Sequence, residues 1–314
     1  MLAAQHGATV ELNAGLTAAT AKDIMSTPKK RAAWVSKQVV QLVKLGAGGI
    51  NFDLEMPMQP GDKAAADYVA LVNLTAQTLR GAVPGASVSV DVPWSPFDID
   101  GRNYDWAGLA AAADTLFIMA YDTASQILGR CIAGANSPLD AVRRSVRQWL
   151  ALGIPASKLV LGLPWYGYDY PCQGEDADTP AAADADLCRL QPVAFQDVSC
   201  SDAAGAQRCY YEIMALLAQK RNTTEVKREP TQASPYFNYR ADDGSIHQVW
   251  YDDPASLALK YQVAADAGLQ GIGIWNLDCL DYSSKDALVQ QQTREMWAAV
   301  GSAVAAFSES VPAS

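Results

Sequence analysis

Residues 49–55 read Gly-Ile-Asn-Phe-Asp-Leu-Glu, and this stretch decides the fold of the chain. Its alternation predicts a strand that carries Asn51, Asp53 and Glu55 on one face and apolar side chains on the other. Residues two apart on a strand lie roughly 6.6 Å apart, so the two acids point to the same side. The alternative is an edge strand with one solvent-exposed polar face. Two acids at a strand end favour a catalytic strand of a parallel barrel, because such barrels place their chemistry at the carboxyl ends of their strands.

Strand-like and helical segments alternate on both sides of this stretch. We predict strands over residues 8–12, 49–55, 87–92, 115–121, 158–163 and 271–275, and helices over 31–45, 68–79, 106–113, 138–152, 255–267 and 285–300. This alternation is typical of an α/β protein with a parallel sheet or barrel. Between about residues 169 and 248 the alternation stops and cysteines gather, which indicates an inserted subdomain of α+β type. We therefore expect a barrel part over 1–168, an insertion over 169–248 and a closing barrel part over 249–314.

Composition limits the classes of partner. The chain has 314 residues, of which 50% are hydrophobic, so it can bury a sizeable core. Its net charge of −10 argues against nucleic acid, because phosphate binding needs a basic surface. No apolar run reaches the roughly 18 residues of a membrane span, and the first residues do not form a signal peptide. We expect a monomer whose partner is its substrate.

The cysteines indicate an oxidising compartment. Four of the six cysteines lie between Cys172 and Cys209, with no spacing typical of zinc ligands. Several pairings are open from sequence alone, and Cys172 with Cys188 is the preferred local pair. The chain has only 2 histidines, which argues against a histidine metal site. We therefore expect no metal and no cofactor.

Other predicted strands also end in polar or aromatic residues: Trp94, Tyr121 with Asp122, and Trp275 with Asn276. Trp275 alone could be a core residue, and Tyr121 with Asp122 could be an ordinary strand end. In a parallel barrel, however, all these ends converge on one mouth. Carboxylates, a phenol and flat indoles fit a sugar, because aromatic rings cover its apolar face and acids bind hydroxyls or move protons.

Competing chemistries lack their motifs. The glycine-rich residues 46–49 precede a strand, whereas a phosphate-binding loop lies between a strand and a helix. The sequence has no GxSxG elbow, and two histidines leave little material for a nucleophilic triad. The acids at the strand ends therefore remain the best candidates for catalysis.

Residues 48–55 resemble the DGxDxDxE signature of family 18 glycoside hydrolases, and residues 119–122, Met-Ala-Tyr-Asp, resemble the MxYD strand end of that family. Residues 164–170, 200–205, 247–252 and 279–282 resemble a lysosomal member of the family, so the similarity covers nearly the whole chain. The resemblance implies a TIM (β/α)8 barrel of the family 18 type with an insertion between strands 7 and 8. It begins at the helix before the third barrel strand, so the first two strands are expected to be missing.

The resemblance also implies the chemistry. Members hydrolyse β-1,4-linked N-acetylglucosamine with retention, and the acetamido oxygen of the substrate is the nucleophile. By the matching positions, Glu55 is the general acid and later base, Asp53 orients and polarises the acetamido group, and Tyr121 donates a hydrogen bond to it. The expected substrate-binding residues are Asn51, Trp94, Asp122, Trp165, Trp275 and Asn276.

The implied substrate is the chitobiose core of asparagine-linked oligosaccharides, in the lysosome or another acidic compartment of the secretory or vacuolar system. A glycan-binding lectin on an inactive barrel is one alternative, but such proteins typically lose the acid that this chain has as Glu55. An endo-acting chitinase is another alternative, and it needs an open cleft for a polymer. An incomplete chain would also explain the absent signal peptide.

Two signature aspartates are replaced, by Gly48 and by Asn51. An aspartate at position 51 could share a proton with Asp53, whereas an amide cannot. We therefore expect a pH profile that differs from that of chitinases, which Asn51→Asp tests. A barrel without two strands has open sheet edges, so we expect either a fragment or a partner that fills the gap.

Overall fold

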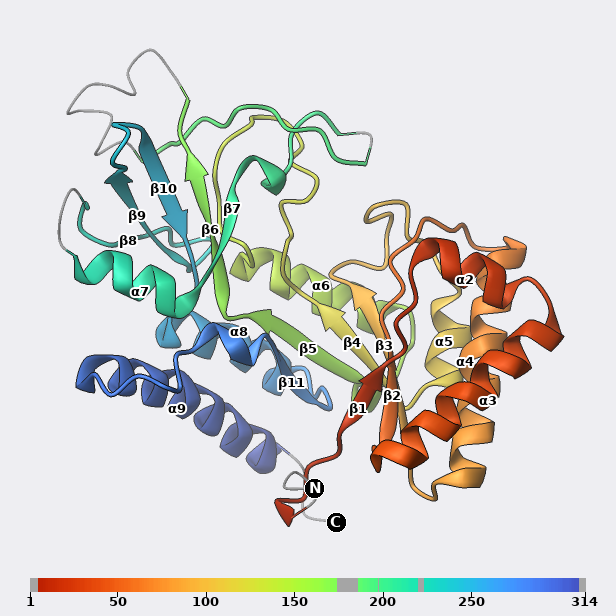
Figure 1. Cartoon of the computed structure of the whole chain (residues 1–314). Coiled ribbons are helices and arrows are strands. Elements are labelled where there is room, and N and C mark those ends of the chain that lie inside the picture. Colours follow the sequence, from red (N-terminus) through yellow and green to blue (C-terminus); the bar gives the residue numbers. More distant parts are fainter. Residues whose placement is uncertain (1–4, 174–185, 197, 220–222, 311–314) are drawn as a thin grey trace. The chain divides into compact units, whose positions relative to one another are not determined.

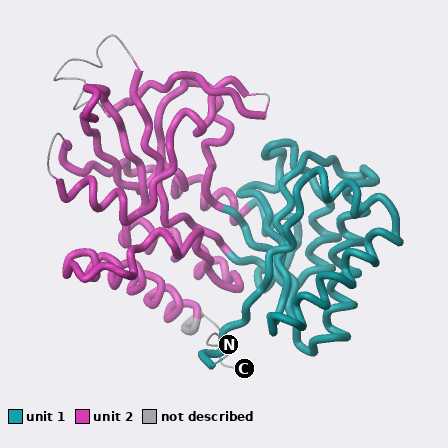
Figure 2. Tube along the Cα trace, viewed as in Figure 1, with its two compact units in different colours: residues 1–119, 148–160 teal, residues 120–147, 161–314 magenta. Residues whose placement is uncertain are grey.

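The computed structural model describes residues 5–173, 186–196, 198–219 and 223–310 (Figure 1). Within the chain, residues 1–119 and 148–160 form unit 1, and residues 120–147 and 161–314 form unit 2 (Figure 2). The order of the parallel strands is β1-β2-β3-β4-β5-β11. This parallel sheet with intervening helices confirms the predicted α/β class.

Unit 1 is built from strands and helices that alternate along the chain. The strands are β1 (Glu11–Asn13), β2 (Gly49–Phe52), β3 (Ser87–Pro93) and β4 (Thr115–Met119), and each pairs in parallel with the next. The helices are α2 (Ala18–Met25), α3 (Pro28–Leu45), α4 (Lys63–Ala82) and α5 (Trp106–Ala112). The register places Asn51 beside Asn13 on β1 and Ser89 on β3. The chain order of these strands is therefore also their order in space.

Local signals set the ends of helix α3. The side chain of Thr27 accepts a hydrogen bond from the backbone N–H of Lys30, and Pro28 occupies the first turn, where its missing N–H costs nothing. At the other end, Gly46 adopts a left-handed conformation with a φ of 63°, which favours glycine. The helix starts three residues before the predicted start at residue 31, because this cap precedes the apolar pattern.

The two faces of the sheet in unit 1 differ sharply. Apolar side chains that alternate along β2, β3 and β4 are completely buried: Ile50, Phe52, Val88, Val90, Leu116 and Ile118 are all 0% exposed. Helix α4 contacts β3, and Tyr68 of this helix packs its ring edge against Phe52. The opposite face carries Glu11, Asn51, Ser89 and Asp91. Burial of the apolar face fixes the register, so the polar residues must point to the other side.

Strand β2 is shorter than predicted. It ends at Phe52. The hydroxyl of Tyr104 forms hydrogen bonds with the backbone of the residues that follow. That hydroxyl accepts a hydrogen bond from the N–H of Met56 at 3.1 Å and lies 2.7 Å from the carbonyl oxygen of Leu54. The predicted strand over 49–55 was therefore wrong in its last three residues, because a side chain replaces the neighbouring strand as hydrogen-bond partner.

Unit 2 contains an antiparallel sheet with the strand order β7-β6-β10-β9-β8. Its strands are β6 (Tyr166–Pro171), β7 (Ala206–Cys209), β8 (Lys227–Arg228), β9 (Pro235–Arg240) and β10 (Ile246–Trp250). Helices α7 (Tyr210–Ala218), α8 (Pro254–Asp266) and α9 (Ala287–Ser310) and strand β11 (Gly271–Trp275) also lie in this unit. Strand β5 (Leu159–Pro164) and helix α6 (Leu139–Ala151) each have residues in both units. The predicted strand over 271–275 is confirmed.

Three disulfides join residues of unit 2: Cys131 with Cys200, Cys172 with Cys188, and Cys209 with Cys279. The preferred local pair is confirmed. The other two bonds connect residues 69 and 70 positions apart, which locality could not have predicted. A disulfide framework is typical of an oxidising compartment.

Candidate active site

The acids of the signature stretch lie directly after strand β2. Asp53 is partly buried, and its Oδ1 atom is buried without a hydrogen-bond partner among the described residues. The side chain of Glu55 is 53% exposed. The hydrogen bonds between the Tyr104 hydroxyl and the backbone of residues 54 and 56 hold this segment in place. A buried oxygen without a partner is costly, so the carboxyl of Asp53 is a good acceptor for a ligand N–H or O–H.

Asn51 belongs to a hydrogen-bond network on the polar face of the same sheet. Its Nδ2 atom donates to the hydroxyl of Ser89 at 3.0 Å and to Oδ1 of Asp91 at 2.9 Å. The hydroxyl of Ser89 in turn donates to the carboxylate of Glu11. A Cβ atom on Gly49 would lie 2.6 Å from the carbonyl oxygen of Ser87, so only glycine allows this close approach of the strands.

Burial and the charges on this face raise two pKa values. Burial, together with the negative charges of Asp53, Glu55 and Glu11, raises the pKa of Asp91 to about 7, although the hydrogen bond from Asn51 acts in the opposite direction. Burial, and then the charge of Glu55, also raise the pKa of Asp53. Carboxyls with raised pKa values are typical of sites that store or transfer protons.

Arg102 forms an ion pair with Glu55. Its guanidinium is buried, and it also donates to Oδ2 of Asp100 at 3.0 Å and to the carbonyl oxygen of Ile99 at 3.3 Å. Met58 anchors this loop, because its N–H donates to the carbonyl oxygen of Gly101 at 3.1 Å. The ion pair therefore links the carboxyl of Glu55 to the loop that carries Arg102.

Trp94 follows strand β3 and is partly buried. Its neighbour Pro93 accepts a hydrogen bond from Nε1 of the fully buried Trp149 at 3.2 Å. Strand β3 thus ends against a rigid core residue. Asn51, Asp53, Glu55 and Trp94 all belong to unit 1.

Tyr121 and Asp122 lie in unit 2, directly after strand β4. Asp122 has a positive φ of 50°, and its N–H donates to Oδ1 of Asn136 at 2.6 Å. Its Oδ1 atom accepts hydrogen bonds from the hydroxyls of Tyr166 at 2.6 Å and Tyr168 at 2.9 Å. The ring of Tyr121 packs edge-on against that of Tyr166. These contacts hold Asp122 in one orientation.

The two predicted tryptophans of unit 2 differ in exposure. Trp275, at the end of β11, is 51% exposed, and Oδ1 of the adjacent Asn276 is buried without a hydrogen-bond partner in the described part of the chain. Trp165 is only 1% exposed and packs edge-on against Trp297. The indole of Trp275 is therefore accessible to a sugar, whereas the ring of Trp165 is not. The predicted convergence of the strand ends of the two units at one barrel mouth stays a prediction.

Asp91, Arg102 and Tyr104 are contacts of the signature stretch that sequence reasoning did not single out. Asp91 had a detectable signal, because residues 87–92, Ser-Val-Ser-Val-Asp-Val, alternate in the same way as residues 49–55. Arg102 and Tyr104 lie in an irregular segment and gave no periodic signal. Their contacts with the signature stretch span 47 to 50 residues.

A pocket of about 390 Å³ lies in unit 1, lined by residues that include Pro60, Asp62, Tyr104, Trp106 and Leu152. None of the predicted site residues lines this pocket, and we assign it no function. Among the described residues, no cluster of His, Cys, Asp or Glu could hold a metal ion. None of the described helices is long and apolar enough to cross a membrane.

In each unit, polar or aromatic residues follow parallel strands, which is typical of a carbohydrate-active α/β protein. The chain belongs to the glycosyl hydrolases family 18, because residues 18–279 match the profile of that family. It is therefore a glycosidase, and the family resemblance seen in the sequence is confirmed.

Two curated relatives illustrate this membership. The chain is 42% identical over 282 residues to di-N-acetylchitobiase of Rattus norvegicus, covering 89% of this chain and 73% of that protein. It is 39% identical over 276 residues to di-N-acetylchitobiase of Homo sapiens, covering 88% of this chain and 69% of that protein.

Solved structures agree on the fold. A group IV chitinase of Ostrinia furnacalis in complex with allosamidin has a TM-score of 0.71 and 20% identity, covering 90% of this chain and 75% of that one. A chitinase of Chromobacterium violaceum has a TM-score of 0.66 and 23% identity, covering 91% of this chain and 74% of that one. The parallel sheet is thus that of a family 18 fold.

Proposed function

We propose that this chain hydrolyses the β-1,4 bond between two N-acetylglucosamine residues of a chitobiose core with a free reducing end. The curated relatives at 42% and 39% identity bear the name di-N-acetylchitobiase, which supports this substrate. One structural observation carries the proposal most directly: Asp53, with its raised pKa and unpartnered Oδ1, lies two residues before Glu55 on a segment that Tyr104 holds. The chain keeps the acid that a binding protein does not need.

The proposed mechanism is substrate-assisted. Glu55 donates its proton to the oxygen of the departing sugar, and the acetamido oxygen of the remaining sugar attacks its own anomeric carbon. Asp53 accepts a hydrogen bond from the acetamido N–H and stabilises the positive charge that develops on the resulting ring. Glu55 then takes a proton from water, which opens the ring with overall retention of configuration. The reaction as written uses only acids, water and the substrate.

The remaining predicted residues receive binding roles in the proposal. Tyr121 donates a hydrogen bond to the acetamido oxygen, and Asp122, held by Tyr166 and Tyr168, accepts hydrogen bonds from sugar hydroxyls. The exposed ring of Trp275 covers an apolar sugar face, and Asn276 offers an unpartnered acceptor beside it. Asn51 acts through Asp91, and Trp94 lines the sugar site. A role for Trp165 would need a side-chain movement, because its ring is buried.

We further propose the finer organisation that the sequence predicts. Residues 169–248 form an insertion between the last two strands of a barrel, flanked by barrel segments 1–168 and 249–314, and the antiparallel sheet supports it. Residues 174–185, 197 and 220–222 of that segment lie outside the described residues. A monomer in an acidic, oxidising compartment is the proposed setting, and the three disulfides support the oxidising part.

The test measures release of N-acetylglucosamine from a core oligosaccharide with a free reducing end, in parallel with polymeric chitin. The proposal expects activity on the oligosaccharide, little on the polymer, and a loss of roughly 10³- to 10⁴-fold in Glu55→Gln. Preference for the polymer would instead identify an endo-acting chitinase. Binding without hydrolysis, with equal affinity in Glu55→Gln, would identify a lectin.

A further inference from the structure

Asp91 lies where the signature stretch meets the next strand. Strand β3 presents Ser87, Ser89 and Asp91 on its polar face, because Val88, Val90 and Val92 are buried on the other. The amide of Asn51 bridges the hydroxyl of Ser89 and the carboxyl of Asp91, with donor–acceptor distances of 3.0 Å and 2.9 Å. Asp91 is therefore linked directly to the position at which the family signature carries an aspartate.

The charged and titratable groups that act on Asp91 are all acids. Asp53 and Glu55 lie in the segment after β2, Glu11 lies on β1, and the phenol of Tyr68 on α4 approaches from the helical side. On its own strand, Ser87 and Ser89 are neutral and engage Glu11. A carboxyl in these surroundings gains by keeping its proton, because a further negative charge would be repelled.

We propose that Asp91 is a positioning residue for the hydrolysis, and that through Asn51 it supplies the catalytic segment with the carboxyl that the family signature carries at position 51. This inference rests on the proposed function. Of Asp53 and Asp91, Asp91 has its pKa at about 7 and takes the proton. Asp53 is then free to ionise toward the acetamido group of the substrate. The proton on Asp91 also removes one negative charge from a face that already holds Glu11, Asp53 and Glu55.

The decisive experiment compares Asp91→Asn with the wild type over pH 4 to 8 on N,N′-diacetylchitobiose. Asparagine imitates the protonated carboxyl, so kcat/KM of the two proteins should agree within about threefold below pH 6. The ratio of wild-type to variant kcat/KM reports the effect of the charge on Asp91. That ratio should fall roughly tenfold between pH 6 and pH 8, because only the wild type acquires a second charge beside Asp53. A constant ratio would overturn the proposal.

Exchanging the amide and the carboxyl between positions 51 and 91 distinguishes this role from a purely structural one. Asn51→Asp places two carboxyls within hydrogen-bond distance and should lower kcat/KM at pH 7 by roughly tenfold. The double variant Asn51→Asp with Asp91→Asn again has one carboxyl and one amide, and should recover to within about threefold of the wild type. If Asp91 served only to hold the fold, the second substitution would give no recovery.

A third measurement does not depend on activity. In protein labelled with ¹³C at the aspartate carboxyl carbons, the resonance missing from Asp91→Asn should titrate near pH 7 in the wild type. Titration near the ordinary value of 3.8 would refute the proton-holding role even in an active enzyme. A wild type that does not cleave the disaccharide contradicts the proposed function, and this titration still decides whether Asp91 holds the proton.

Discussion

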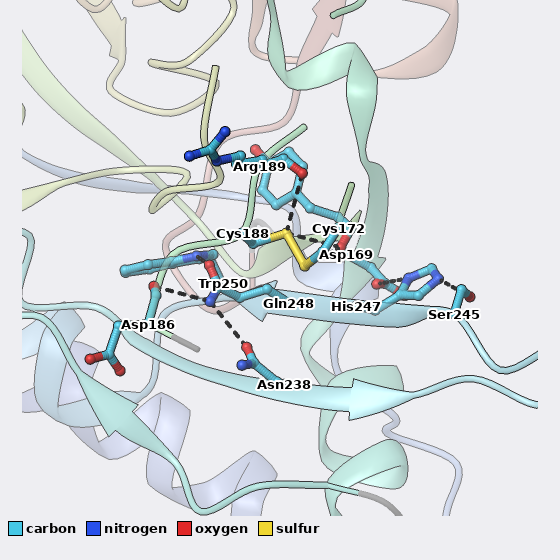
Figure 3. The surroundings of a disulfide bond; sticks show 11 residues. Asp169, Cys172, Asp186, Cys188, Arg189, Asn238, Ser245, His247, Gln248 and Trp250 are labelled. Atoms are coloured by element: carbon cyan, nitrogen blue, oxygen red, sulfur yellow. Dashed lines mark hydrogen bonds and ion pairs between the residues drawn. A yellow bond between two sulfur atoms is a disulfide. The ribbon is translucent and has the colours of Figure 1, made fainter. Parts of the chain in front are cut away.

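Asp91 in unit 1 and Asp169 in unit 2 are both aspartates on strands, yet their surroundings are opposite. Asp91 receives one hydrogen bond from a neutral amide and faces other acids. Asp169 is 2% exposed and accepts hydrogen bonds from Arg208, Tyr239 and His247 at 2.6, 2.7 and 2.8 Å. Figure 3 shows the contact with His247. Burial opposes its ionisation, but these three partners outweigh burial and hold the pKa of Asp169 below its ordinary value.

The difference separates carboxyls that stabilise a fold from carboxyls available for chemistry. Asp169 has cationic or polar partners that satisfy its charge, so the antiparallel sheet gains stability from its ionised form. Among the described residues, Asp91 accepts one hydrogen bond from an amide and Oδ1 of Asp53 accepts none, so burial and the neighbouring negative charges oppose the ionisation of both carboxyls. A protein retains such an unfavourable arrangement where a ligand or a proton transfer makes use of it.

The largest expected effect concerns activity. Glu55→Gln should lower kcat by roughly 10³- to 10⁴-fold, because the amide cannot donate the proton that the leaving oxygen requires. Asp169→Asn, the matched control in the satisfied cluster, should leave kcat per folded molecule within about threefold. The measurement is steady-state release of N-acetylglucosamine, normalised to folded protein by circular dichroism. Similar losses in both variants would show that the two regions do not differ in function.

Asp53 and Glu55 were predictable as site residues, because the alternation along a strand is a local signal that can be read without tertiary information. The predicted strand was too long, because the hydroxyl of Tyr104, about 50 residues further on, replaces the neighbouring strand as hydrogen-bond partner. The ion pair between Arg102 and Glu55 was also missed, since an irregular loop carries no period that marks its contacts. Local pairing of Cys172 with Cys188 was predictable, whereas the bond between Cys209 and Cys279 depends on how unit 2 folds.

The second prediction concerns stability and pH, with opposite signs for the two aspartates. Between about pH 4 and pH 7, the folded chain keeps a proton on Asp91 that the unfolded chain releases, so stability falls as pH rises through this window. The loss is at most about 4 kcal/mol, since each pKa unit is worth about 1.4 kcal/mol. In Asp91→Asn this loss should be absent, as measured by urea unfolding at pH 4, 5.5, 7 and 8. The same slope in both proteins would rule out a raised pKa at Asp91.

The third prediction tests the satisfied cluster. Asp169→Asn should lower the free energy of unfolding at pH 7 by about 2 kcal/mol, below the range for fully buried pairs because Arg208 is 39% exposed. The pKa of Asp169 is lowered, so its stabilisation is complete above its ordinary pKa and is lost as pH falls through the folded value. The difference between wild type and variant should therefore shrink below about pH 4. The exposed Asp186, which pairs with Lys227, provides a control whose substitution changes little. A difference that grows on acidification would contradict the assignment.

The smallest expected effect concerns Arg102, the one cation that contacts the predicted general acid in the described part of unit 1. Arg102→Gln removes the ion pair that holds the carboxyl of Glu55. Steady-state kcat should fall by only about threefold, because the side chain of Glu55 is 53% exposed and water screens the pair. Arg31→Gln, which removes an ion pair with Asp67 in the same unit, should leave kcat unchanged. An unchanged kcat in Arg102→Gln, or an equal loss in Arg31→Gln, would mean that the ion pair does not position the acid. The functional difference between the two units would then rest on the contrast between Asp91 and Asp169 alone.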